Sequence, residues 1–260
     1  MQGPTGLDAY SPREMAERIE AIGVAKAALP LVPLITLGVL AGVFIGFGGL
    51  LFTAITAGAE QTGALRLLGG VGFSLGLILV VVGGAELFTG NALMVMAWAD
   101  RRITHRALAR NWAVVLLANL AGALGLVATV WAAGMLDGPH GAQAAAIAGA
   151  KLALGPLEAF CRGALCNALV CLAVWLTMAA RSVTDKVLAI LWPIAGFVAL
   201  GFEHSVANFY LIPAGLLAGA EGGAAAVLGN LVPVTLGNIL GGAGGVALAY
   251  RLAYGPGRPG

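Results

Sequence analysis

Long runs without any charged side chain most constrain what this chain can fold into. Asp, Glu, Lys and Arg are all absent from residues 27–59, 111–136 and 222–250. Each run exceeds the roughly 20 apolar residues that a helix needs to cross the hydrocarbon core of a membrane. The runs are continuously apolar and lack the alternation that is typical of a transmembrane β-barrel. The sequence therefore predicts an all-α membrane protein that crosses the bilayer several times.

Six spans follow from the distribution of these residues along the chain. They are expected at residues 29–56, 65–99, 106–134, 156–180, 187–220 and 224–252. A Gly/Ala-rich loop with Asp137, His140 and Lys151 is expected between the third and fourth spans. Residues 83–91 and 201–208 place glycines, an acid and an asparagine inside the second and fifth spans, which disfavours a continuous helix there.

Interrupted spans at corresponding positions of two halves indicate inverted repeats with a transport pathway between them. We therefore expect two three-helix halves of opposite orientation. Glu203 is the only charged residue and His204 the only histidine in residues 187–220. A charge at that depth costs roughly 2.5 kcal/mol or more, so this pair is expected to serve the pathway and not only the packing.

The two ends of the chain are polar. Residues 1–27 are expected to form a cytoplasmic segment whose short amphipathic helix begins at the Ser11–Glu14 capping box. Residues 28–254 form the membrane domain and residues 255–260 a cytoplasmic tail. Eleven of the Lys and Arg residues fall on the side of both termini and three on the other side. This bias predicts that both termini are cytoplasmic.

Several functions are disfavoured by what the sequence lacks. The net charge of +2 is spread over short loops, which predicts no nucleic-acid partner. The three cysteines lie at spacings of five on one apolar helix, so neither a metal site nor a disulfide is expected. One central histidine with a lysine at the mouth of an otherwise apolar pore suits a small monovalent anion. Apolar rings exclude the bare ion but admit its neutral conjugate acid.

Four stretches resemble one family of membrane proteins. Residues 83–91 (GGAELFTGN) are similar to the broken second helix of the formate/nitrite transporter family, and residues 201–208 (GFEHSVAN) to its fifth-helix signature. Residues 163–175 resemble its fourth helix and residues 230–238 its sixth. The matches occur in order and span most of residues 10–254, so the chain is identified by resemblance as a member of this family.

The resemblance implies an aquaporin-like protomer with its own pore, in a homopentamer of the bacterial inner membrane. It assigns the substrate pathway to His204, Thr89, Glu203, Lys151, Asn167 and Asn238. It assigns the apolar constrictions to Phe73, Leu77, Leu87, Phe88 and Phe197. In that assignment His204 is the central pore histidine, Thr89 its partner at the broken second helix, and Lys151 the entrance lysine. No cofactor, metal or catalytic residue is implied.

The substrate within the family is less sharply indicated. Members move formate, nitrite or hydrosulfide, by passive or proton-linked transport. Residues 72–79 and 180–186 look most like formate channels. The loop between the fifth and sixth spans is shorter than in formate channels, and residues 163–175 also look like nitrite channels. We expect formate, with nitrite or hydrosulfide as the alternative.

Two other classes of protein were weighed. A neutral-solute channel of the aquaporin type would carry paired Asn-Pro-Ala motifs, which are absent from the sequence. A membrane-embedded enzyme would need several histidines or acids at depth, and only one histidine falls inside a span. The chain is therefore not expected to be an enzyme.

Overall fold

The structure, a computed structural model, describes residues 9–255. Residues 1–8 of the expected N-terminal segment and residues 256–260 of the expected tail lie outside the described residues. The part of the chain that is described is helical and contains no strand. Its helices are α1 (Pro12–Ala27), α2 (Leu31–Thr56), α3 (Gly63–Gly83), the 3₁₀ turn η1 (Gly90–Met94), α4 (Val95–Ala99), α5 (His105–Ala132), α6 (Gly138–Leu152), α7 (Pro156–Ala179), α8 (Val183–Ala199), α9 (Ser205–Leu217), α10 (Ala224–Ile239), the π-helical η2 (Leu240–Leu248) and α11 (Ala249–Tyr254).

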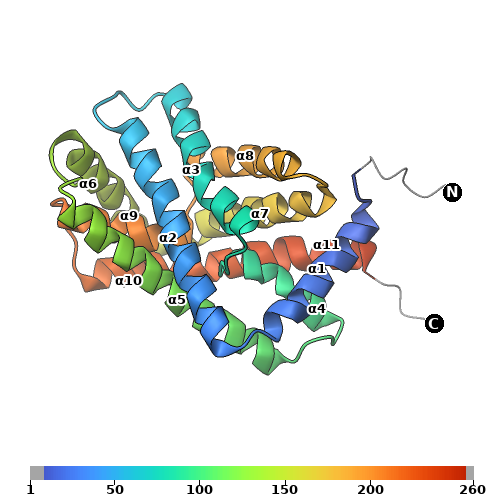
Figure 1. Ribbon diagram of the computed structural model, residues 1–260. Coiled ribbons are helices and arrows are strands. Elements are labelled where there is room, and N and C mark those ends of the chain that lie inside the picture. Colours follow the sequence, from blue (N-terminus) through green and yellow to red (C-terminus); the bar gives the residue numbers. More distant parts are fainter. Residues whose placement is uncertain (1–8, 256–260) are drawn as a thin grey trace, which may run out of the picture.

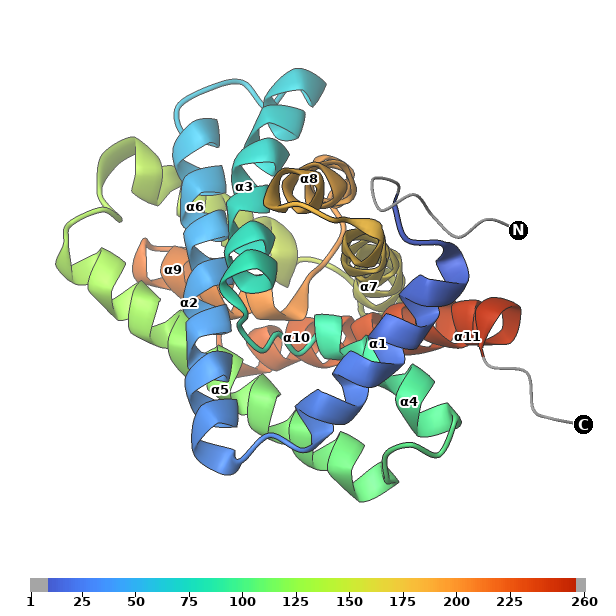
Figure 2. The ribbon, with the colours of Figure 1, turned by 45° about the vertical axis from the view of Figure 1, so that its right-hand side comes forward.

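The two halves of the chain repeat the same order of elements. A leading helix, α1 or α6, precedes a long helix, a broken pair and a second long helix. In the first half α2 packs on α3 and α5, and in the second half α7 packs on α8 and α10. The halves meet where α3 packs on α8. Figures 1 and 2 show the leading helices α1 and α6 at opposite ends of the molecule. The predicted six spans in two inverted repeats are confirmed.

Both predicted interruptions are also confirmed. Within residues 9–255, five helices are each long and apolar enough to cross a membrane, and one of them is α3 of the second span. The shorter apolar helix Gly90–Ala99 completes the second span, and α8 with the shorter apolar helix Ser205–Leu217 forms the fifth. Gly84 follows α3 with φ +80°, and Gly201 follows α8 with φ +70°. This left-handed conformation ends a helix and is far easier for glycine than for other residues. The two breaks therefore depend on glycine at the same place in each half.

The predicted loop between the third and fourth spans is wrong, because residues 138–152 form the helix α6. Its Ala144 and Ala148 are buried against α9. A side chain at Gly215 of α9 would clash with both alanines, so only glycine allows this close approach. The helix places Lys151 in its last turn.

The predicted amphipathic helix forms as α1. Its capping box is present, since the Ser11 amide donates to Glu14 Oε2 at 2.7 Å and the Glu14 amide donates to Ser11 Oγ at 3.4 Å. Met15 and Ile19 are buried among residues of η1 and α4. The helix therefore docks onto the bundle.

α1 also buries an acid, Glu20, beside a second acid. Arg102 Nη1 donates to Glu20 Oε2 at 3.1 Å, and Arg251 Nε donates to Asp100 Oδ1 at 2.7 Å. Glu20 Oε1 and Asp100 Oδ2 are both buried without a hydrogen-bond partner among the described residues. Burial raises the pKa of the Glu20 carboxyl, and the neighbouring Asp100 raises it further.

This raised pKa predicts a pH dependence of stability. A carboxyl whose pKa is higher in the folded state than in the unfolded state, about 4.3 for Glu, stabilises the fold most below the unfolded value. That contribution is lost as the pH rises through the folded value. For the wild-type protein, the Glu20 contribution should raise the melting temperature as the pH is lowered from about 7.5 to about 4.5. We expect this increase to be smaller in Glu20→Gln. Glu17→Gln, on the exposed face of the same helix, is the control. A Glu20→Gln profile parallel to that of the wild type would contradict the assignment.

Candidate functional site

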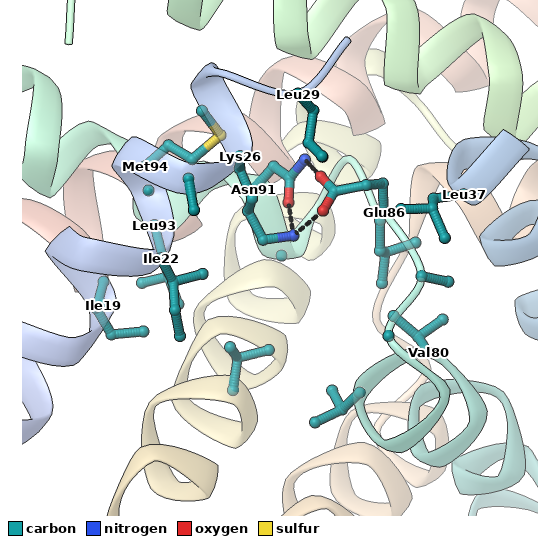
Figure 3. A pocket seen from close by; sticks show the side chains of 18 of the residues that line it. Ile19, Ile22, Lys26, Leu29, Leu37, Val80, Glu86, Asn91, Leu93 and Met94 are labelled. Carbon is teal, nitrogen blue, oxygen red and sulfur yellow. Dashed lines mark hydrogen bonds and ion pairs between the residues drawn. The ribbon is translucent and has the colours of Figure 1, made fainter. Parts of the chain in front are cut away.

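A buried glutamate at the first break is held by residues from three helices. Glu86 is 4% exposed. Lys26 Nζ of α1 lies 2.6 Å from Glu86 Oε1, and Asn91 Nδ2 donates to Glu86 Oε2 at 2.8 Å (Figure 3). Asn91 also donates to Asn111 Oδ1 of α5 at 2.8 Å, and Lys26 Nζ donates to Asn91 Oδ1 at 3.0 Å. The charge at this depth is therefore paired and hydrogen-bonded, as the high cost of a lone buried charge requires.

The second break repeats this arrangement. Glu203 is 3% exposed. Lys151 Nζ of α6 lies 2.8 Å from Glu203 Oε1, and Asn208 Nδ2 donates to Glu203 Oε2 at 2.7 Å. Asn208 also donates to Asn230 Oδ1 of α10 at 2.8 Å. Each asparagine follows its glutamate by five residues. Lys26 is thus the counterpart of Lys151 in the first half.

Two further asparagines fasten the broken backbone. Asn119 accepts from the Phe88 amide at 2.9 Å and donates to the carbonyls of Gly38 (2.7 Å) and Glu86 (2.9 Å). Asn238 does the same in the second half. It accepts from the Ser205 amide at 2.8 Å and donates to the carbonyls of Gly163 (2.8 Å) and Glu203 (2.9 Å). At each break the asparagine satisfies one backbone amide and one backbone carbonyl that no helix can satisfy there. Its third bond, to Gly38 of α2 or Gly163 of α7, ties the break to a long helix.

His204 lies at the centre as the N-cap of α9. Its Nδ1 accepts from the Ala207 amide at 3.0 Å, so this nitrogen carries no hydrogen and the neutral ring carries it on Nε2. Nε2 then donates to Thr89 Oγ1 at 2.9 Å. The hydroxyl hydrogen of Thr89 is left to donate to a third group. The position that corresponds to His204 in the first half is Leu87, which offers no cap.

Asn167 completes the surroundings of Thr89. Its Nδ2 donates to the Thr89 carbonyl at 3.2 Å and to the Asn238 carbonyl at 2.6 Å. Cys171 Sγ lies 3.5 Å from the same Thr89 carbonyl. Asn167 and Asn238 therefore contact backbone at or beside the breaks, and neither is in the lining of the two cavities described next.

Two cavities lie on either side of this centre. One, of about 400 Å³ beside α1, is called here the Lys26 cavity; its lining includes Ile22, Lys26, Leu77, Glu86, Leu87 and Asn91 (Figure 3). The other, of about 320 Å³ beside α6, is called the Lys151 cavity; its lining includes Phe73, Lys151, Arg162, Phe197, Glu203 and His204. The two cavities share no lining residue.

Apolar side chains form the wall between the cavities. Phe73 faces the Lys151 cavity and Leu77, one turn further along α3, faces the Lys26 cavity. Phe73 and Phe197 pack edge to face with ring centroids 5.6 Å apart, and Phe197 stacks on His204 at 6.0 Å. Phe88 differs from the other four expected constriction residues, because it lines neither cavity and packs on Trp112 of α5.

The sequence missed the first-half counterparts of this site. Lys26, Asn111 and Asn119 were not expected to take part, and Lys26 was counted only as a basic residue. A comparison of the two halves was the available signal, since Glu86 and Asn91 have the spacing of Glu203 and Asn208. Among residues 9–255 no cluster of three His, Cys, Asp or Glu residues could hold a metal ion.

Several known proteins are similar to this chain over most of its length. The profile of the formate/nitrite transporter family matches residues 13–252. The chain is 39% identical over 278 residues to the formate channel FocA of Escherichia coli strain K12, with 98% of each chain covered. It is 40% identical over 273 residues to a probable formate transporter of Methanothermobacter thermautotrophicus, with 96% of this chain and 98% of the relative covered.

Solved structures are similar over most of the chain. One is described as a pentameric formate channel with formate bound; it has a TM-score of 0.79 at 40% identity and covers 86% of this chain and 97% of its own. Another, an FNT family ion channel, has a TM-score of 0.87 at 30% identity and covers 92% and 98%.

The fastening role of the asparagines is testable by stability. Asn238→Ala leaves the Ser205 amide and the Glu203 carbonyl at the second break without their partner, and each buried unsatisfied group costs about 1–3 kcal/mol. We expect a lowered melting temperature in detergent, and a similar loss for Asn119→Ala because its bonds correspond. Gln143→Ala is the control, since this half-buried side chain makes one side-chain contact, to Thr56 Oγ1. Equal melting temperatures for all three variants would contradict the role.

Proposed function

Because this chain belongs to the formate/nitrite transporter family, we propose that it carries formate across a membrane along a pathway that joins the Lys151 cavity to the Lys26 cavity. The observation that carries the proposal is the hydrogen bond between Thr89 and His204, which lies between two cavities that each hold a Lys–Glu pair. The relatives named formate channels support formate as the substrate. The proposal includes no catalytic step.

The apolar wall sets the central problem for an anion. Formate is a carboxylate of about the acid strength of Asp, with a pKa near 4, so it reaches either cavity ionised at neutral pH. Lys26 and Lys151 attract it there. Between Phe73 and Leu77 the bare ion would lose its hydration without a counter-charge, whereas neutral formic acid would lose far less.

The hydrogen-bond geometry limits what His204 can supply. If Nε2 gave its hydrogen towards formate through Thr89, the ring would be left as an unstable anion, because Nδ1 carries no hydrogen to compensate. We therefore assign to His204 the orientation of Thr89, whose hydroxyl donates a hydrogen bond to a carboxylate oxygen. The proton that neutralises formate comes from water in the cavity and returns to water beyond the wall.

This division of roles is tested by flux of formate into proteoliposomes. His204→Phe removes the donor to Thr89 and should abolish formate flux. Thr89→Val keeps the shape but removes the hydroxyl, and we expect a loss of tenfold or more, about 1.4 kcal/mol of barrier. Thr89→Ser is the matched control and should retain most of the flux. Nitrite, hydrosulfide and glycerol serve as competing solutes. Wild-type formate flux in both Thr89→Val and His204→Phe would contradict the proposed roles of Thr89 and His204.

The proposed setting is the cytoplasmic membrane, with both termini in the cytoplasm and five copies of the chain in one assembly. The eleven-to-three distribution of basic residues supports the orientation. Large apolar side chains exposed on the outer helices, including Leu117, Trp131 and Trp192, support contact with lipid or with other copies.

The orientation has its own test. Reporter fusions in the loops near Glu60, Asp137 and Glu221 should report the outer side of the membrane, because the eleven basic residues of the larger group fall on the opposite side of the spans. A fusion near Arg101 should report the cytoplasm. A cytoplasmic result at any of the first three would overturn the orientation.

A further inference from the structure

The two cavities differ in the side chain that is carried at one pair of corresponding backbone positions. The Glu86 amide donates to the carbonyl of Leu37 at 3.1 Å, and the Glu203 amide donates to the carbonyl of Arg162 at 3.3 Å. Leu37 lines the Lys26 cavity and Arg162 lines the Lys151 cavity. The same place in the two repeats therefore carries an apolar side chain on one side and a guanidinium on the other.

The guanidinium of Arg162 is fixed at the mouth of its cavity. Its Nη1 donates to the Gly201 carbonyl at 3.0 Å, where α8 ends, and its Nη2 pairs with Glu158 Oε1 at 2.6 Å. The side chains of this pair are 39% and 51% exposed, so solvent screens their attraction. The positive charge of Arg162 can therefore still attract an anion in the cavity. Its planar guanidinium has the geometry to hydrogen-bond both oxygens of a carboxylate.

A second arginine lines the same cavity. The side chain of Arg66 is exposed and makes no hydrogen bond or ion pair to another residue within the range 9–255. The charged lining of the Lys151 cavity is then Arg66, Lys151 and Arg162 against Glu203, beside the neutral ring of His204. That of the Lys26 cavity, drawn in Figure 3, is Lys26 against Glu86. Even with Glu158 counted, only the Lys151 cavity has an excess of positive charge.

We propose that Arg162, assisted by Arg66, makes the Lys151 cavity a binding site for small carboxylate or oxyanion substrates that the Lys26 cavity lacks. The inference rests on the proposed function and adds an asymmetry to it. A unit charge about 7 Å from the anion in a water-filled cavity favours occupancy by about threefold. This field weakens as salt shortens the screening length.

The asymmetry has a defined kinetic form. In a passive pathway at equal pH and zero membrane potential, detailed balance makes the ratio of maximal flux to half-saturating concentration equal from both faces. A binding site near one face therefore lowers the half-saturating concentration from that face, together with the maximal flux. We expect formate to half-saturate at an about threefold lower concentration from the Lys151 face, and this difference should shrink in high salt.

The experiment measures formate flux in right-side-out and inside-out vesicles from the same cells. An N-terminal tag reports orientation, because α1 lines the Lys26 cavity. Arg162→Gln should raise the half-saturating concentration from the Lys151 face towards the value for the other face, whereas Arg162→Lys should raise it less. Leu37→Arg, which copies the charge into the Lys26 cavity, should lower the value from that face. Arg106→Gln removes an exposed charge outside both cavities and should change neither value.

The outcomes separate this inference from the proposed function. Formate flux with equal half-saturating concentrations from both faces, unchanged in Arg162→Gln, would overturn the inference and leave the function standing. Flux no greater than in vesicles without the protein, from both faces, would overturn the function and the inference together. If Leu37→Arg fails to fold, Arg162→Gln still decides.

Discussion

Backbone groups at two interruptions inside a membrane must find partners within the protein, and this requirement organises the whole molecule. Lipid offers no hydrogen bonds, so a broken helix is stable only where other side chains complete it. Asn119 and Asn238 do this for the first and second breaks. The long helices that supply these side chains must cross at fixed places, which ties the bundle to the two breaks.

The central residues of the proposed pathway lie where the two halves differ. The fastening asparagines and the Lys–Glu pairs are repeated, and by themselves they would build a symmetric scaffold. His204 replaces the leucine of the first half, and Thr89 corresponds to Val206. These departures put one hydrogen-bonded pair at the centre, and Arg162 in place of Leu37 gives the linings of the two cavities different charge.

The sequence was a good guide to spans and breaks, because both depend on local composition. Charge-free runs located the helices, and the glycine-rich polar stretches located the interruptions at Gly84 and Gly201. It was a poor guide to α6, because the glycines there disfavour a helix and were given more weight than the alanines that favour one. The helix packs on α9 through Ala144 and Ala148. Lys26 was missed because its partner lies sixty residues away. The roles expected of the pathway residues stay predictions.

The cap on α9 has a consequence for how such a chain can arise. An assembly of two separate identical halves would place the same side chain at positions 87 and 204, either two leucines or two histidines. A single imidazole against a hydrophobic neighbour needs two different sequences in one molecule. Because both halves lie in one polypeptide, each can carry its own side chain at this position, which an assembly of identical halves cannot do.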